Sequence, residues 1–170
     1  MHITFDKLKE RDYNGFCDDV KEIFSIAVVE TFGHPEDGRE IISADKVYRT
    51  LQNPMCETYA VYADSVKVGG VAIKADATTG HNSLELFYIF PDRQGKGLGL
   101  QIWQGVEKMY PGTKVWRLTT PYFEKRNIHF YVNKCGFKIV EFFGKAHCDS
   151  NYPLTGKDYH DEYFIFEKLI

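Results

Sequence analysis

Residues 90–110 read FPDRQGKGLGLQIWQGVEKMY, and three of the five positions from Gly95 to Gly99 are glycine. An apolar pattern of helical period begins within the same stretch, at Leu98, Ile102, Val106 and Met109. The first backbone N–H groups of a helix lack intrahelical partners and carry partial positive charge, so an anion bound there gains hydrogen bonds and dipole energy together. Glycine is needed where a side chain would block the anion. The stretch therefore predicts a phosphate-binding loop ahead of a helix.

The predicted loop, which we call the glycine loop, comprises Gln94, Gly95, Lys96, Gly97, Leu98 and Gly99. Lys96 and Arg93 would add positive charge to its backbone N–H groups. Two established phosphate-binding motifs do not fit: the P-loop pattern is absent, and Ile102 stands where the dinucleotide fingerprint requires a third glycine. A glycine-rich turn that binds no ligand is the alternative at this point.

On both sides of the glycine loop, apolar patterns typical of strands and of helices follow one another. Strands are expected over residues 2–5, 56–63, 66–75, 83–90, 114–120, 136–143 and 161–169. Helices are expected over residues 16–27, 44–53 (with Ser43 as N-cap), 98–109 and 123–135. Asp64 and Ser65 predict a hairpin turn, and Gly69 with Gly70 a β-bulge. This order predicts a mixed α/β fold whose sheet is covered by helices on both faces.

Composition limits the class of protein. With 170 residues, the chain is expected to form one domain, residues 1–170. A formal net charge of -3 gives neither the basic surface that nucleic acid requires nor the charge excess of disorder. Four cysteines without a C-x-x-C pair predict reduced thiols, so no metal is expected. The N-terminus meets charged residues before any apolar run, and no membrane span of about 18 apolar residues occurs, so a cytoplasmic protein without a membrane partner is expected.

Two motifs resemble those of a known family. The pattern Gln94-x-x-Gly97-x-Gly99, entered from a strand ending in YIFP, resembles the acyl-coenzyme A signature of the GNAT superfamily of N-acetyltransferases. The stretch RNIHFYVNKCGF at residues 126–137 resembles that family's asparagine, tyrosine and Gly-Phe region. The two together, in the family's order, are far more specific than either alone. One departure concerns Tyr131, which precedes Gly136 by five residues where many members have four.

The resemblance implies both a fold and a cofactor. The implied fold is a central, mostly antiparallel, twisted sheet of about six to seven strands, splayed at its centre and flanked by about four helices. The implied cofactor is acetyl-coenzyme A as acyl donor, with its pyrophosphate on the amides of the glycine loop. Its pantetheine arm would pair with strand backbone at Phe87 and Ile89, whose side chains would also fill the core. Asn127 is implied as a further contact of that arm, or else as a helix cap.

The implied reaction moves the acetyl group to an uncharged amine, which requires oxyanion stabilisation and a proton for the departing thiolate. The Ile89 N–H is expected to serve the oxyanion, and Tyr131 to protonate the thiolate. The alternative for Tyr131 is a ring that only packs. Glu85 is the candidate base, directly or through water, and a surface carboxylate is its alternative. Strand alternation predicts that Glu85 shares a face with Phe87 and Ile89, opposite Leu84, Leu86 and Tyr88.

The acceptor is expected between two loops, residues 32–38 and 147–163. These loops carry aromatic rings and the carboxylates Glu36, Asp37, Asp149, Asp158, Asp161 and Glu162. Carboxylates beside rings suit a cationic amine, although solvated loop charge is the alternative. The expected function is an N-acetyltransferase acting on a primary amine of a small molecule or peptide in a ternary complex. A non-catalytic acyl-coenzyme A sensor and another kind of nucleotide-binding domain are the competing classes, and a homodimer is left open.

Overall fold

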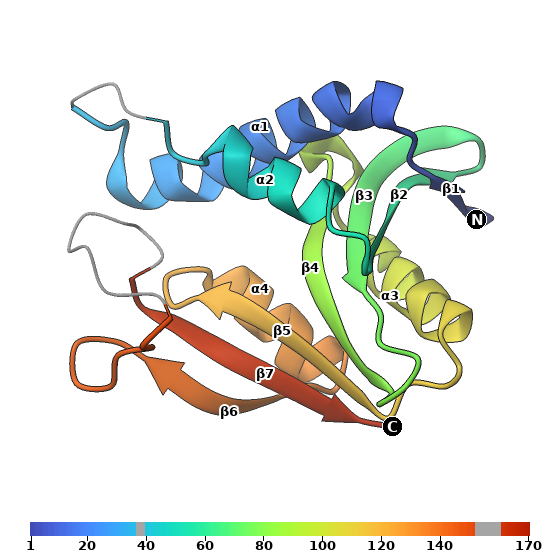
Figure 1. Cartoon of the computed structure of the whole chain (residues 1–170). Coiled ribbons are helices and arrows are strands. Elements are labelled where there is room, and N and C mark those ends of the chain that lie inside the picture. The colour runs from blue at the N-terminus through green and yellow to red at the C-terminus, as the bar shows by residue number, and fades with distance from the viewer. Residues whose placement is uncertain (37–39, 152–160) are drawn as a thin grey trace.

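A computed structural model of the chain describes residues 1–36, 40–151 and 161–170. In this part of the chain, seven strands form one sheet with the order β1-β2-β3-β4-β5-β7-β6 (Figure 1). The strands are β1 Ile3–Lys7, β2 Cys56–Ala63, β3 Val66–Lys74, β4 His81–Ile89, β5 Val115–Pro121, β6 Lys138–Phe143 and β7 Tyr163–Leu169. All neighbouring strands are antiparallel except β4 and β5, which run parallel. The expected mostly antiparallel sheet is confirmed.

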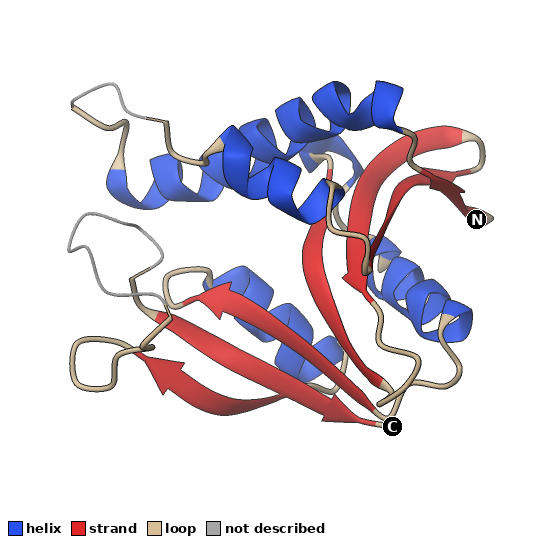
Figure 2. Cartoon of the chain, viewed as in Figure 1, coloured by secondary structure: helices blue, strands red, loops and turns tan. Residues whose placement is uncertain are grey.

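The described residues contain four α-helices, as expected. They are α1 Tyr13–Phe32, α2 Ala44–Leu51, α3 Leu98–Met109 and α4 Lys125–His129. Short 3-10 turns occupy Glu10–Asp12 and Pro91–Arg93, and α4 continues into a π-helical turn, Phe130–Lys134. Figure 2 shows helices on both faces of the sheet. Within the described residues, no helix combines the length and the apolar character needed to cross a membrane.

Two hydrophobic cores lie on opposite faces of the sheet. The larger core packs α3 and α4 against the strands around the rings of Trp103, Trp116 and Phe137, and the smaller packs α1 and α2 around Phe16. Strand β4 contributes to both, because Ile89 packs in the larger core and its neighbour Tyr88 in the smaller. Successive side chains of a strand point to opposite faces, so β4 is the strand that both helical layers position.

The sheet is splayed where β4 and β5 meet. The two strands pair only over residues 81–84 and 115–118, and β5 continues beside β7 as far as Pro121. Residues 85–89 of β4 therefore have no partner strand on their β5 side within the described part of the chain, and we call this segment the unpaired edge. Figure 1 shows β4 and β5 diverging from a common end. The splayed centre implied by the family resemblance is thus confirmed.

The β2–β3 hairpin has the predicted turn but uses its glycines differently. Asp64 and Ser65 both have positive φ, 48° and 68°, as the central residues of a type I′ turn require. The bulge in the β2–β3 ladder lies at Val68, because Val61 pairs with Gly69 and Tyr62 with Lys67. The two glycines are instead required by close packing: a side chain at either Gly69 or Gly70 would overlap Tyr88.

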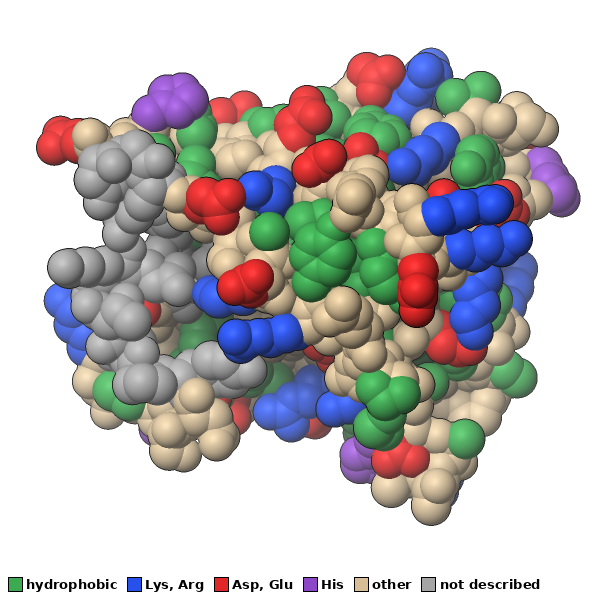
Figure 3. All heavy atoms as spheres, turned by 45° about the horizontal axis from the view of Figure 1, so that its top comes forward, with side chains coloured by type: hydrophobic (Ala, Val, Ile, Leu, Met, Phe, Trp, Pro, Cys, Tyr) green, Lys and Arg blue, Asp and Glu red, His purple; other side chains and the backbone are tan. Residues whose placement is uncertain are grey.

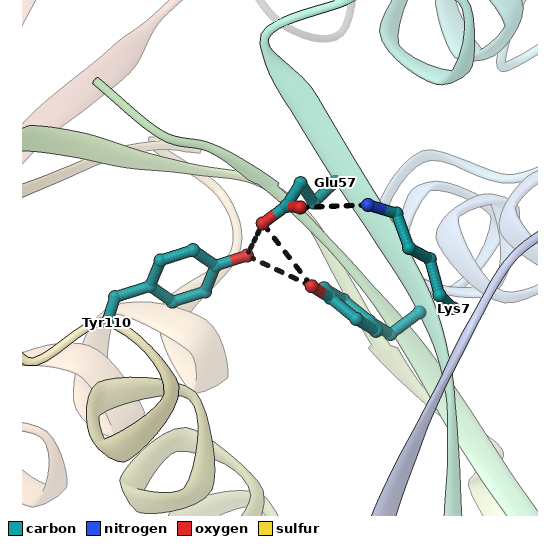
Figure 4. A network of polar contacts seen from close by, with 4 residues as sticks. Lys7, Glu57 and Tyr110 are labelled. Carbon is teal, nitrogen blue, oxygen red and sulfur yellow. Dashed lines mark hydrogen bonds and ion pairs between the residues drawn. The ribbon is translucent and has the colours of Figure 1, made fainter. Parts of the chain in front are cut away.

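A polar network ties α3 to the β1–β2 end of the sheet (Figure 4). The Glu57 carboxylate accepts hydrogen bonds from Lys7 Nζ at 2.9 Å and from the Tyr110 hydroxyl at 2.7 Å. Tyr59 donates to the same carboxylate at 3.3 Å. The hydrogen bond from Lys7, followed by that from Tyr110, lowers the pKa of Glu57.

We expect Glu57→Gln to lower the free energy of unfolding by about 1 kcal/mol at pH 7, because a charged acceptor is lost while its donors remain. A depressed folded-state pKa adds stability above the unfolded pKa of about 4.3, and this stability disappears as the pH falls through the folded value. Urea unfolding measures the difference in the free energy of unfolding between the two proteins, which should be present at pH 7 and smaller at pH 3. Equal unfolding midpoints at pH 7 would show that the network contributes nothing.

Candidate active site

The glycine loop joins the turn Pro91–Arg93 to α3 in a conformation that glycine favours. Gly95, Lys96 and Gly97 have φ values of 96°, 51° and 74°, in the left-handed region. A side chain at Gly95 or Gly97 would meet nothing within 4 Å, so open space surrounds the loop at these positions. At Gly99, a side chain would lie 3.2 Å from the Phe130 ring, which makes Gly99 a packing requirement.

Most backbone donors of the loop are available to a ligand. The Gln94 N–H donates to the Pro91 carbonyl at 3.3 Å, and the Leu98 N–H donates to the Gly95 carbonyl at 3.1 Å. The loop N–H groups that find no acceptor among the described residues are those of Gly95, Lys96, Gly97 and Gly99. Unpaired N–H groups at the start of a helix are a recurrent anion site. Two of the six predicted amides thus bind the protein itself, and four are left for an anion.

The unpaired edge presents main-chain groups to the β5 side. The Phe90 N–H donates to the Val68 carbonyl of β3 at 2.9 Å, and Tyr88 pairs with Gly70 of the same strand. Because bonded and non-bonded pairs alternate in an antiparallel ladder, the main-chain groups of Phe87 and Ile89 point away from β3. These are the two residues from which backbone pairing with an extended ligand is expected.

Gln94 connects the glycine loop to both the unpaired edge and α4. Its Nε2 donates to the Ile89 carbonyl at 3.0 Å, and its Oε1 accepts from the Arg126 guanidinium. Arg126 therefore lies beside the loop, although it follows 32 residues later in the chain. Arg93, in contrast, pairs with the neighbouring Asp92 at 3.0 Å. The structure brings Lys96 and Arg126 to the loop from two different elements.

Glu85 does not share the face that strand alternation predicts. In the β3–β4 ladder, Ile73 pairs with Leu84 and Ala72 with Leu86, so Glu85 is the extra residue of a β-bulge. The bulge reverses the alternation: Leu84 packs with Phe87 and Ile89 in the larger core, while Leu86 and Tyr88 pack in the smaller one. The predicted grouping of Leu84 with Leu86 and Tyr88 is wrong for this reason.

The exposed Glu85 carboxylate lies on the α1–α2 side of the sheet. It accepts a hydrogen bond from the Ser83 hydroxyl. Ser83 pairs with Lys74, which pairs with Cys56, so these three residues share one face. Burial, and then the Glu85 carboxylate, raise the pKa of the Cys56 thiol. Glu85 is thus an accessible carboxylate at the start of the unpaired edge.

The π-helical turn accommodates the unusual spacing of Tyr131 and Gly136. The Cys135 N–H donates to the Phe130 carbonyl at 3.1 Å, which closes a turn with one residue more than an α-helical turn. The Phe137 N–H donates to the Tyr131 carbonyl at 3.0 Å, and Gly136 takes a φ of 81°. The extra residue is absorbed in this wide turn, which ends at the Gly-Phe pair.

The Tyr131 side chain is only 8% exposed, and its ring packs against those of Phe130, Phe137 and Phe166. Burial, the largest cause, raises its pKa, so the hydroxyl stays protonated at neutral pH. No hydrogen bond joins that hydroxyl to any described residue. A buried phenol without a partner keeps its proton available for a ligand.

Arg126 and Asn127 of the second motif lie at the surface of α4. Asn127 is exposed, and the N-cap position of α4 is occupied by Glu124, so Asn127 does not cap this helix. Neither Glu124 nor Arg126 was assigned to the site from the sequence, although the structure places Arg126 beside the glycine loop and Glu124, half-buried, at the start of α4. The spacing of seven residues between Glu124 and Tyr131, two helical turns, could have drawn attention to the former.

The two loops expected to surround the acceptor are described in part. Glu36, Asp149, Asp161 and Glu162 are described, whereas Asp37 and Asp158 lie outside the described residues. The Asp149 carboxylate accepts from the Tyr163 hydroxyl at 2.8 Å. A pocket between α1 and residues 40–42, lined by Lys21, Ser25 and Ile42 among others, does not include the glycine loop or the unpaired edge. Figure 3 shows acidic and basic side chains interspersed on the face it presents.

Comparison with known proteins identifies the family. Residues 17–137 match the model of the Acetyltransferase (GNAT) family. The chain is 40% identical over 174 residues to YrkN of Bacillus subtilis (strain 168), described as an uncharacterized protein, and the match covers 99% of this chain and 94% of that one. The chain belongs to the GNAT family of acetyltransferases.

Solved structures share the fold at low sequence identity. An acetyltransferase from Thermus thermophilus matches with a TM-score of 0.70 and 15% identity, over 100% of this chain and 98% of that one. PaiA N-acetyltransferase from Thermoplasma acidophilum, solved with coenzyme A, matches with a TM-score of 0.64 and 20% identity over 100% of both chains. Spermidine N-acetyltransferase from Vibrio cholerae, solved with coenzyme A and spermine, matches with a TM-score of 0.66 and 13% identity, over 98% and 95%.

Proposed function

We propose that residues 1–170 form a single acetyltransferase domain that transfers an acetyl group from acetyl-coenzyme A to a primary amine of a small molecule or peptide. The amine attacks directly while both substrates are bound. One observation carries the proposal. N–H groups of the glycine loop that find no acceptor among the described residues lie next to the unpaired edge of β4, and the Gln94 side chain links the two by its hydrogen bond to the Ile89 carbonyl. Membership of the GNAT family supports the donor and the reaction class.

The residues present fit the cofactor. The N–H groups of Gly95, Lys96, Gly97 and Gly99, which find no acceptor among the described residues, would hold its pyrophosphate. The backbone of Phe87 and Ile89 would pair with its pantetheine arm. Lys96 and Arg126 would supply positive charge, and Asn127 is a proposed contact from α4. Gln94 and Leu98 would hold the loop in shape, because their N–H groups bind protein carbonyls. When bound, the cofactor supplies the activated acetyl group as a thioester.

Three residues would carry the chemistry. The Ile89 N–H, at the unpaired edge, would stabilise the negative charge that develops on the acyl oxygen. The buried Tyr131 hydroxyl, which has no hydrogen-bond partner among the described residues, would donate a proton to the leaving thiolate. Glu85 would take the proton of the acceptor amine, directly or through water, and its hydrogen bond from Ser83 orients the carboxylate.

An amine-panel assay with acetyl-coenzyme A that follows free thiol tests the proposal. The transferase predicts amine-dependent thiol release with at least one class of primary amine. The competing sensor predicts coenzyme A binding without release, which the same protein shows in a thermal-shift titration. A third class, another nucleotide-binding domain, predicts a larger shift with ATP or NAD than with coenzyme A. Binding of coenzyme A without release by any amine would favour the sensor.

A further inference from the structure

Glu124 is a half-buried carboxylate at the start of α4, three residues after β5 ends at Pro121. It occupies the N-cap position, but its side chain makes no capping hydrogen bond. The Phe32 ring at the end of α1 packs edge-on against Phe123, with ring centroids 5.1 Å apart. The C-terminus of α1 thus lies against the segment that holds Glu124.

Glu124 differs from other half-buried carboxylates in having no partner among the described residues. Asp19 pairs with Lys67 at 2.6 Å, Glu107 with Lys168 at 2.6 Å, and Glu57 with Lys7 at 2.9 Å. No hydrogen bond or ion pair joins the Glu124 side chain to any residue that the structure describes. Removing a charge from water without a partner costs free energy, and a bound cation would offset that cost.

The charges around Glu124 leave its own charge uncompensated. Burial is the main cause that raises its pKa, and Glu30 of α1 raises it further, while Arg126 acts in the opposite direction. The Arg126 guanidinium is already bound to the Gln94 side chain. The carboxylates of Glu30 in α1 and of Glu124 at the N-cap of α4 thus repel each other, and no cation in the described part of the chain pairs with Glu124.

The Tyr131 hydroxyl is the second unsatisfied group on the same side of α4. The spacing i, i+4 and i+7 brings Glu124, Ile128 and Tyr131 to one face of the helix. Ile128, between the other two, packs in the larger core. The Glu124 carboxylate is near enough to contribute to the raised pKa of Tyr131. A nine-tenths buried phenol and a carboxylate, neither with a partner among the described residues, thus share one side of this helix.

We propose that Glu124 binds the ammonium group of the acceptor beside Tyr131, with Glu30 adding to the negative potential, so that the enzyme selects alkyl amines, which are cations at neutral pH, over neutral aryl amines. This inference rests on the proposed transferase function and specifies its substrate class. Binding an ammonium ion would satisfy the carboxylate, and Glu85 would remain the group that removes the proton.

Carboxyl NMR of protein labelled with [13C]glutamate tests binding without turnover. The Glu124 resonance is assigned by its absence in Glu124→Gln, and benzylamine is added in the presence of coenzyme A. We expect the Glu124 resonance to shift and its apparent pKa to fall on saturation. A response of Glu85 alone, or of no carboxyl group, overturns the proposal.

Activity with a matched pair of amines supplies the second readout. For Glu124→Gln, we expect the KM for benzylamine to rise about tenfold or more, with a smaller effect on kcat and little change for aniline. Glu10→Gln, an exposed carboxylate on the turn Glu10–Asp12, is the control and should change neither amine. Unchanged discrimination between the two amines overturns the proposal. If Glu124 responds by NMR but wild-type protein releases no thiol with any amine, binding stands and the proposed transfer is wrong.

Stability gives a third readout that needs no ligand. Because burial raises the folded-state pKa of Glu124 above the unfolded value of about 4.3, the charged side chain costs stability above that pH. Glu124→Gln should therefore raise Tm by about 2–4 °C at pH 8 and by less at pH 4. A lower Tm at pH 8 would mean that the carboxylate has a stabilising partner, which contradicts the proposal.

Discussion

Replacing both Gly95 and Gly97 with alanine is expected to weaken coenzyme A binding about a hundredfold while leaving the chain folded. Both residues have φ values in the left-handed region, 96° and 74°. A residue with a Cβ atom costs about 1–2 kcal/mol there, so the loop relieves the strain by turning its N–H groups away from their present directions. About 1.4 kcal/mol corresponds to a factor of ten in affinity, so two positions give about a hundredfold. Isothermal titration with coenzyme A measures the loss.

A matched control separates loop geometry from backbone strain. Gly33, at the end of α1, has a φ of 78°, and a side chain there would also meet nothing within 4 Å. With a ψ of −179°, Gly33 lies in a region that only glycine adopts readily, so Gly33→Ala carries at least as much strain in similarly open space but lies outside the glycine loop. We expect a lower free energy of unfolding and unchanged coenzyme A affinity. A control that lost affinity as strongly as the double variant would show that the loop has no special role.

The glycine loop was predictable because its signal is local. Three glycines ahead of a helical apolar pattern determine both a left-handed backbone and free N–H groups, and Gly95 and Gly97 show the expected conformation. The turn at Asp64 and Ser65 was predictable for the same reason, since two residues that tolerate positive φ separate two β-branched runs. Such features depend on a few neighbouring residues and need no knowledge of tertiary packing.

The environment of Glu85 was not predictable in this way. Strand alternation assumes a regular ladder, and a single bulged residue in β4 transfers every later side chain to the opposite face. The requirement for Gly69 and Gly70 likewise depends on Tyr88, which belongs to the neighbouring strand. The extra residue between Tyr131 and Gly136 was visible, but whether a bulge, a longer turn or a π-helical turn absorbs it depends on packing against the sheet. Glu124 was missed because a carboxylate that lacks a partner, here among the described residues, is recognised only when its surroundings are known.

Tyr131→Phe is expected to slow thiol release about a hundredfold with little change in coenzyme A affinity or stability, because general acids contribute about 10²–10⁴ and a thiolate needs less help than an alkoxide. The lost hydroxyl has no hydrogen-bond partner among the described residues, so its removal should change the free energy of unfolding by less than about 0.5 kcal/mol. Single-turnover release of thiol, together with urea unfolding, measures both quantities.

Tyr88→Phe is the matched control and should give the opposite result. Tyr88 is also buried, but its hydroxyl donates to the Asp19 carboxylate at 2.8 Å, on the face of the sheet that α1 covers. Its removal should cost about 1–3 kcal/mol of stability and leave thiol release unchanged.

The pH dependence of thiol release tests the role of Tyr131 further. Because burial raises the pKa of Tyr131, wild-type release should not decline between pH 8 and about pH 10 through loss of the acid. If wild-type release does decline in that range and Tyr131→Phe removes the decline, the phenol ionises in the working enzyme. Full activity of Tyr131→Phe would mean that the ring only packs in the core.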